Sequence, residues 1–157
     1  MSASDKPVAG RRRWLAAAGA LVGSSAFAQV APPAVDVPGI RVLDEFRAGR
    51  SLRFGRLKLV VPRIADNGNA VPMRVTMDAP PTGHAGIRSL RLFSETNPVP
   101  LMARFDFMVA PPRVEIESRI RLAGSQRVVA VAELGDGTLE ADVAAVIVTL
   151  GACLDGT

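Results

Sequence analysis

The sequence is poor in the side chains that most catalytic and metal-binding sites require. Its 157 residues include no tyrosine, one tryptophan, one histidine and one cysteine. A single cysteine excludes an intramolecular disulfide, and one cysteine with one histidine cannot complete a Cys/His zinc site. A nucleophile–histidine–carboxylate triad would depend on His84, which lies in the loop-like segment PPTGHAG, where we expect a solvated histidine. Most familiar enzyme and metal sites therefore lack their residues here.

The N-terminus has the three parts of an export signal. Three arginines, Arg11 to Arg13, precede an apolar run from Trp14 to Phe27, which ends in the small-residue pattern Ala26-Phe27-Ala28. This order predicts that residues 1–28 are a cleaved secretory signal. The arginine pair followed by Trp14-Leu15 resembles the twin-arginine pattern. The run of about 15 apolar residues is short for a membrane span.

The signal also accounts for most of the positive charge. The chain has a net charge of +4, from 19 basic and 15 acidic residues, of which the first 28 residues contribute four and one. The mature chain would keep 15 basic and 14 acidic residues, a net charge of +1. Such a near-neutral protein has no electrostatic reason to bind nucleic acid or a membrane surface. We expect a periplasmic protein exported through the twin-arginine route.

The mature chain has the pattern of a β-sandwich preceded by one helix. Residues 29–39, rich in Pro, Ala and Val, are expected to form a linker, and the spacing of Ile40, Leu43 and Phe46 predicts a short helix. Alternating apolar and polar residues then predict about seven strands, separated by Pro-, Gly- and Asn-rich turns: 57–61, 71–77, 87–93, 101–108, 114–122, 128–132 and 139–150. This favours an antiparallel, immunoglobulin-like sandwich over residues 40–150, without the cysteine pair of antibody domains.

The last predicted strand has an ambiguous face. Glu140 and Asp142 mark that face as polar, yet Val146, Val148 and Leu150 follow on the same face. Either the end of this strand is buried on both sides, or these three residues meet a partner protein. The pattern leaves both alternatives open.

The most distinctive chemical group is the thiol of Cys153, in a C-terminal tail of residues 151–157. Three residues beyond Leu150, at roughly 3.4 Å each, would carry it about 10 Å past the sandwich. A free thiol with a pKa near 8.5 is only a few per cent ionised at neutral pH, and Asp155 would disfavour the thiolate further. Any activation must come from a partner, unless Cys153 is simply a small apolar residue at a frayed end.

Five segments, in order along the chain, resemble the SoxY family of thiosulfate-oxidation proteins. They are residues 42–46 (VLDEF), 61–68 (VPRIADNG), 93–100 (FSETNPVP), 128–133 (VVAVAE) and 148–153 (VTLGAC). The resemblance implies a periplasmic, non-catalytic immunoglobulin-like carrier that pairs with SoxZ. It implies a sulfur intermediate held covalently on Cys153 of a flexible arm, with no other cofactor. A c-type cytochrome would load thiosulfate there, and a thiol hydrolase would release sulfate.

The arm departs from the family pattern Gly-Gly-Cys-Gly-Gly. Here Gly151 and Ala152 precede the cysteine, and Leu154 and Asp155 follow it. Glycines keep an arm thin and pliable, whereas Leu154 adds bulk and Asp155 adds negative charge. The sequence is more similar to a SoxY-related subgroup whose arm reads Ala-Ala-Cys-Ile-Glu.

Two other functions remain open from the sequence. The domain could be a binding module in which Cys153 is incidental. It could also be an assembly or thiol-redox adaptor for a periplasmic cytochrome or quinoprotein system, forming a mixed disulfide at Cys153.

Overall fold

The computed structural model describes residues 35–80 and 86–151. The predicted export signal, most of the predicted linker, His84 and the arm beyond Gly151, including Cys153, lie outside these residues. Among the described residues, no helix is long and apolar enough to cross a membrane.

The described chain begins with the helix predicted from the spacing of Ile40, Leu43 and Phe46. Helix α1 spans Arg41–Arg47, and Leu43 is its buried residue. It ends at Ala48, which adopts a left-handed conformation with φ of 46°, and Gly49 follows at φ 79°. Two successive left-handed residues stop the helix, and glycine adopts this conformation without strain. The chain then enters the first strand.

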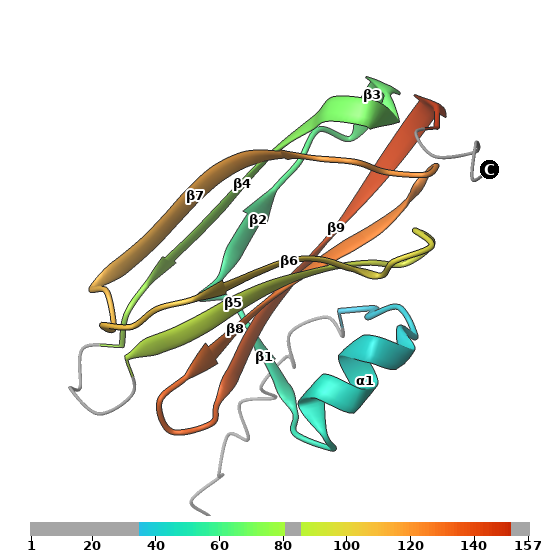
Figure 1. Cartoon of the computed structure of the whole chain (residues 1–157). Coiled ribbons are helices and arrows are strands. Elements are labelled where there is room, and N and C mark those ends of the chain that lie inside the picture. The colour runs from blue at the N-terminus through green and yellow to red at the C-terminus, as the bar shows by residue number, and fades with distance from the viewer. Residues whose placement is uncertain (1–34, 81–85, 152–157) are drawn as a thin grey trace, which may run out of the picture. The chain divides into compact units, whose positions relative to one another are not determined.

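Within residues 35–80 and 86–151, nine strands form two sheets, whose arrangement is shown in Figure 1. The larger sheet has the order β1-β9-β8-β5-β6, with β3 also paired to β9, and the smaller sheet has the order β2-β4-β7. The bounds are β1 Leu52–Phe54, β2 Lys58–Val60, β3 Ile64–Asn67, β4 Val71–Asp78, β5 Ile87–Ser94, β6 Leu101–Asp106, β7 Arg113–Ile120, β8 Gln126–Leu134 and β9 Leu139–Leu150, with a short 3-10 turn, Gly68–Ala70, before β4.

The prediction of an immunoglobulin-like sandwich with a short N-terminal helix is confirmed. All seven predicted strands are present, and they pair antiparallel with one another. Strands β1 and β3 were not predicted. They have three and four residues, too few to show an alternating pattern, and both pair parallel to β9. Parallel pairing of such short segments depends on β9 being in place, which local sequence does not encode.

Two hydrophobic clusters hold the domain together, and β8 belongs to both. Val128 and Ala130 face the space between the sheets, whereas Val129 and Val131 face helix α1 on the other side. This two-sided burial explains why the strand is apolar without interruption. Phe93 extends the second cluster beneath the helix, where its ring centroid lies 6.1 Å from that of Phe46.

A polar network fastens the end of helix α1 to the large sheet. The guanidinium of Arg50 donates to the carbonyl oxygen of Phe46 at 2.9 Å and to Oε1 of Glu133 on β8 at 2.9 Å. Arg91 lies 3.4 Å from the other carboxylate oxygen and 3.8 Å from the ring centroid of Phe46. The hydrogen bond from Arg50 is the main reason that the pKa of Glu133 lies below its ordinary value. The helix is thus held by packing and by paired charge.

We predict that Glu133→Gln destabilises the domain at neutral pH by about 1 kcal/mol, because it removes the charge that both arginines share. A carboxyl with a lowered folded pKa stabilises the protein fully above its unfolded pKa, near 4.5, and loses that contribution as the pH falls through the folded value. Urea unfolding of wild type and variant should therefore differ at pH 7 and converge well below pH 4.5. Glu45→Gln, in the exposed pair with Arg41, is the control and should change little. A difference that persists undiminished in acid would contradict the assignment.

Candidate functional site

The predicted arm starts from the end of a firmly held strand. β9 pairs with β8 along residues 139–146 on one side, and with β1 and then β3 on the other. The last pair joins Leu150 to Asn67. Backbone pairing therefore holds β9 as far as Val146 on the side of β8 and as far as Leu150 on the side of β3. Only two residues separate Leu150 from Cys153.

The three residues predicted as a partner interface have different environments. Val146 and Val148 are buried in the core between the sheets, with 2% and 9% of their surface exposed. Their side chains lie in the chain's own core, but the end of the strand is not buried on both of its faces. Leu150 is 68% exposed. On the opposite face of the strand, Ile147 is 55% exposed and lies beside its register partner Ile64, which is 61% exposed.

Glu140 and Asp142 do not mark a solvent face, contrary to the expectation from the pattern. Both share the inward face of β9 with Val146. Asp142 accepts a hydrogen bond from the backbone N–H of Leu59, 2.8 Å away on β2, a donor that the smaller sheet leaves unpaired on that side. Glu140 is 4% exposed, and desolvation raises its pKa. Glu140 is therefore buried and Asp142 is half-buried. The alternating pattern did not reveal this, because both carboxylates occupy inward-facing positions that are usually apolar.

Gly151 is the root of the arm, and it packs against the loop between β7 and β8. A Cβ atom added to Gly151 would lie 2.2 Å from the carbonyl oxygen of Ala123 and 3.1 Å from its carbonyl carbon. Real side chains do not approach a backbone this closely, so only glycine fits. The first residue of the arm is therefore a structural contact, in addition to any contribution it makes to the arm's pliability.

A hydrogen-bonded clamp holds the loop against which Gly151 packs. Nδ2 of Asn97 donates to the carbonyl oxygen of Arg121 at 2.8 Å, and its Oδ1 accepts from the N–H of Ala123 at 2.9 Å. Nε2 of Gln126 donates to the same Oδ1 at 2.9 Å. The hydroxyl of Ser125 accepts from the N–H of Val148 at 2.9 Å. These bonds tie the loop after β5, the loop after β7 and the end of β9 into one unit.

Ion pairs of Arg127 on β8 add to the same unit. Nη2 of Arg127 lies 2.6 Å from Oε1 of Glu95, and Nη1 lies 2.5 Å from Asp36. The hydrogen bond from Arg127 lowers the pKa of Glu95, and its partner carboxylates raise the pKa of Arg127. Asp36 belongs to the predicted linker, so the end of that segment contacts the domain at Arg127 on β8.

Glu95 and Asn97 belong to residues 93–100, one of the segments named in the sequence analysis. The sequence analysis did not single out Ser125 or Gln126, and no periodicity marks them. Their roles depend on contacts between segments more than 20 residues apart, such as Gln126 with Asn97.

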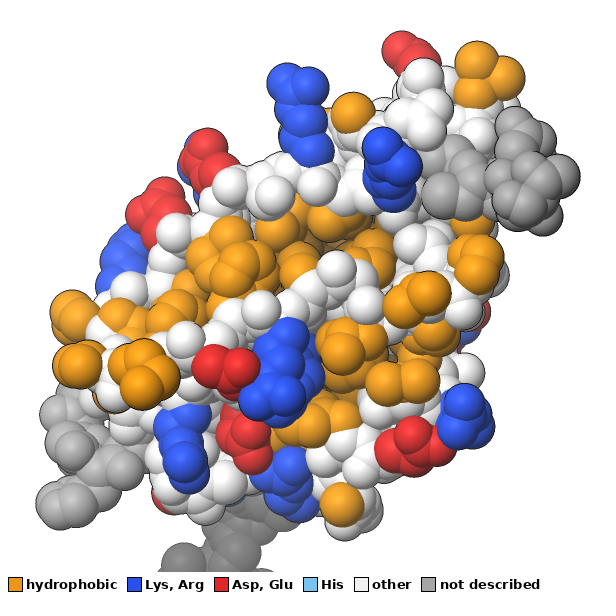
Figure 2. Space-filling model, viewed as in Figure 1, with side chains coloured by type: hydrophobic (Ala, Val, Ile, Leu, Met, Phe, Trp, Pro, Cys, Tyr) orange, Lys and Arg blue, Asp and Glu red, His pale blue; other side chains and the backbone are white. Residues whose placement is uncertain are grey.

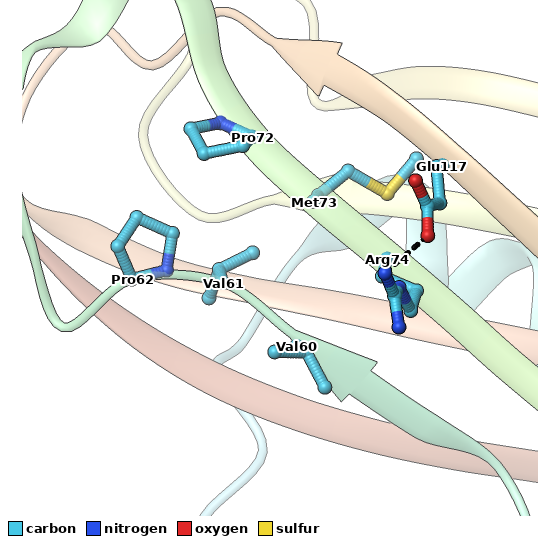
Figure 3. A pocket seen from close by; sticks show the side chains of 7 residues that line it. All are labelled: Val60, Val61, Pro62, Pro72, Met73, Arg74 and Glu117. Atoms are coloured by element: carbon cyan, nitrogen blue, oxygen red, sulfur yellow. Dashed lines mark ion pairs between the residues drawn. The ribbon is translucent and has the colours of Figure 1, made fainter.

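A hollow on the smaller sheet is lined mainly by apolar side chains. Its volume is about 330 Å³, and Val61, Pro62 and Pro72 point toward one another across it (Figure 3). Arg74 and Glu117 lie at its side and pair with each other. No nucleophile lines it. In the described part of the chain, no three metal-ligating side chains cluster either.

We predict that Gly151→Ala destabilises the domain by about 1–3 kcal/mol, because the new methyl group must displace either the end of β9 or the Ala123 carbonyl. Gly124→Ala is the matched control, since a Cβ there meets nothing within 4 Å. Denaturant unfolding of both variants measures the difference. Equal stabilities would show that the close contact does not constrain the arm root.

Comparison with known proteins places the chain in a family. The family model described as "Sulfur oxidation protein SoxY" matches residues 44–153, so the match ends at Cys153. No curated protein matches the chain.

Solved structures give weak likenesses. A superoxide reductase (neelaredoxin) from Ignicoccus hospitalis is 19% identical, with a TM-score of 0.46 over 60% of this chain and 80% of that one. A putative superoxide reductase from Thermotoga maritima is 16% identical, with a TM-score of 0.46 over 66% and 89%. These likenesses carry no argument about function. The family match does, because SoxY proteins are periplasmic, non-catalytic carriers of sulfur oxidation that work with SoxZ. The chain belongs to the SoxY family.

Proposed function

We propose that this protein carries a sulfur intermediate as a covalent adduct on Cys153 during the oxidation of thiosulfate-type compounds. The observation that carries the proposal is the family match, which runs through the whole sandwich and ends at this cysteine. The structure supports it by fixing the chain up to Gly151, two residues before the thiol. The arm would then be a short tether on a rigid platform.

The chemistry needs enzymes outside this chain. Joining the Cys153 thiol to thiosulfate forms an S–S bond, releases one proton and removes two electrons, which a c-type cytochrome would accept. Hydrolysis of the resulting S–SO₃⁻ group consumes one water, releases sulfate and a proton, and leaves a persulfide on the cysteine. A thiol near pKa 8.5 is mostly protonated at neutral pH, so the enzymes must also activate it. The domain supplies position, and its partners supply catalysis.

A SoxZ-like subunit is the proposed stable partner, and the surface of Ile64 and Ile147 is its proposed contact. These two residues lie side by side on the outer face of the large sheet, and Leu150 is exposed at the end of the same strand. Neighbouring exposed apolar side chains on a paired sheet are typical of a protein interface. A partner bound here would lie next to the arm root.

The proposal also gives a role to each segment outside the sandwich. Residues 1–28 would direct export through the twin-arginine route and be removed after Ala28. Residues 29–39 would link the new N-terminus to the sandwich domain, and residues 151–157 would form the carrier arm. The mature protein would work in the periplasm.

We predict that mature protein, incubated with its cytochrome partner and thiosulfate, gains the mass of one S₂O₃ group at Cys153, as measured by intact-protein and peptide mass spectrometry. Cys153→Ser should gain nothing while keeping its fold, because the substitution lies beyond the last strand. Absence of any sulfur adduct on the wild type would contradict the carrier function. A mixed disulfide between Cys153 and a partner would instead support the adaptor alternative.

We predict that Ile147→Glu weakens binding of the SoxZ-like subunit at least about tenfold, because it places an unpaired charge in an apolar contact. Val60→Glu is the control, since Val60 is similarly exposed, at 58%, but lies on β2 of the smaller sheet. Isothermal titration calorimetry with the purified partner gives both affinities. Weakening by Val60→Glu alone would place the partner on the other sheet.

A further inference from the structure

The sandwich is open along one side, between strands β6 and β7. Each is the last strand of its sheet, and no described strand pairs with its free edge. A hollow of about 420 Å³ lies between them, and we call it the flank hollow. Leu101, Met102 and Phe105 of β6 contribute to its apolar lining. Figure 2 shows apolar side chains gathered in this hollowed strip of the surface.

The flank hollow adjoins the loop against which the root of the arm packs. Asn97 lines it, and the same side chain donates to the carbonyl oxygen of Arg121 and accepts from the N–H of Ala123. The carbonyl oxygen of Ala123 is the atom against which Gly151 packs. One clamped loop therefore separates the hollow from the last described residue of the chain.

The chain beyond Gly151 is long enough to occupy the hollow. Six residues, 152–157, follow Gly151. At roughly 3.4 Å each they extend about 20 Å, and Leu154 lies within about 10 Å of the root. Leu154 is apolar and matches the lining of the hollow. A Gly-Gly ending would have no side chain to bury there.

The charges of hollow and tail are complementary. Arg119 and Arg121 also line the flank hollow, and neither forms an ion pair with a carboxylate of the described residues. The tail contains the carboxylate of Asp155. A sulfonate on Cys153 would add further negative charge. The two arginines are thus placed to pair with anionic groups of the arm.

We infer that residues 152–157 dock in the flank hollow when no enzyme holds the arm, with Leu154 on the apolar lining and the anionic groups beside Arg119 and Arg121. Docking covers the open side of the sandwich and holds the thiol against the domain, away from other thiols. Its use in protecting a sulfur adduct rests on the proposed function, but the docking itself does not. Leu154 and Asp155, the two residues that differ from the family's Gly-Gly after the cysteine, would then anchor the arm.

Disulfide trapping in the mature chain tests the docking. Val99 lines the flank hollow and is 70% exposed, so Val99→Cys places a thiol at the proposed docking site. We expect it to form an intramolecular disulfide with Cys153, under glutathione disulfide, at least about tenfold faster than Val60→Cys, which lies on β2. Rates are normalised to the reactivity of each cysteine measured alone. Equal normalised rates would overturn the inference.

A second comparison keeps the length of the tether constant. In the Val99→Cys protein, Leu154→Gly and the double change of Arg119 and Arg121 to Ala should each slow trapping at least about threefold. Unchanged rates in both would overturn the inference, because the tail would then reach Val99 by diffusion alone. If Met102→Glu abolished binding of a partner subunit without slowing trapping, the hollow would belong to that partner, and the inference would also fail.

These outcomes are separate from those of the proposed function. Loading of wild-type Cys153 with thiosulfate is measured by mass and does not depend on trapping rates. Normal loading with equal trapping rates rejects the docking and keeps the carrier. Fast, Leu154-dependent trapping without loading keeps the docking and rejects the carrier.

Discussion

The structure depends on the burial of strand β8 on both of its faces. Val128 and Ala130 contribute to the core between the sheets, and Val129 and Val131 contribute to the cluster under helix α1. A strand of small and β-branched side chains suits this position, because both neighbouring layers can approach it closely. β9 is aligned by its pairing with β8, and the arm root is aligned by β9. The position of the arm root, Gly151, is therefore set by packing at the centre of the domain.

The elements that sequence patterns predicted are those whose stability is local or whose burial is regular. The helix around Leu43 and the seven predicted strands have a clear period, and the structure contains them all. β1 and β3 have none, because three or four residues form a strand only where β9 offers an edge. Periodicity also assigned Glu140 and Asp142 to the solvent. It cannot detect a carboxylate that enters the interior to accept a backbone hydrogen bond, as Asp142 does from Leu59.

The sequence suggests the chemistry of the proposed site, but it does not reveal the contacts that support the arm root. A lone cysteine near the end of the chain is visible in the sequence, and the family resemblance gave it a role. The arm root is supported by contacts between distant segments: Asn97 with Ala123, Ser125 with Val148, and Gly151 with Ala123. None of these residues is unusual for a loop or a strand end. Their importance comes from three-dimensional proximity, which a single sequence does not contain.

The contact of Gly151 with Ala123 also limits how the protein can deliver a cargo. Because the chain is held up to Gly151, the Cα atom of Cys153 can move no more than about 7 Å from that fixed point. A tether this short cannot reach into a deep active-site funnel while the domain stays outside. Under the proposed function, each enzyme that acts on Cys153 would have to bring its catalytic groups to within about 10 Å of the sandwich, close to the end of β9. The tip of the domain is then part of what the enzyme recognises, and the length of the arm sets the depth of every active site that it serves.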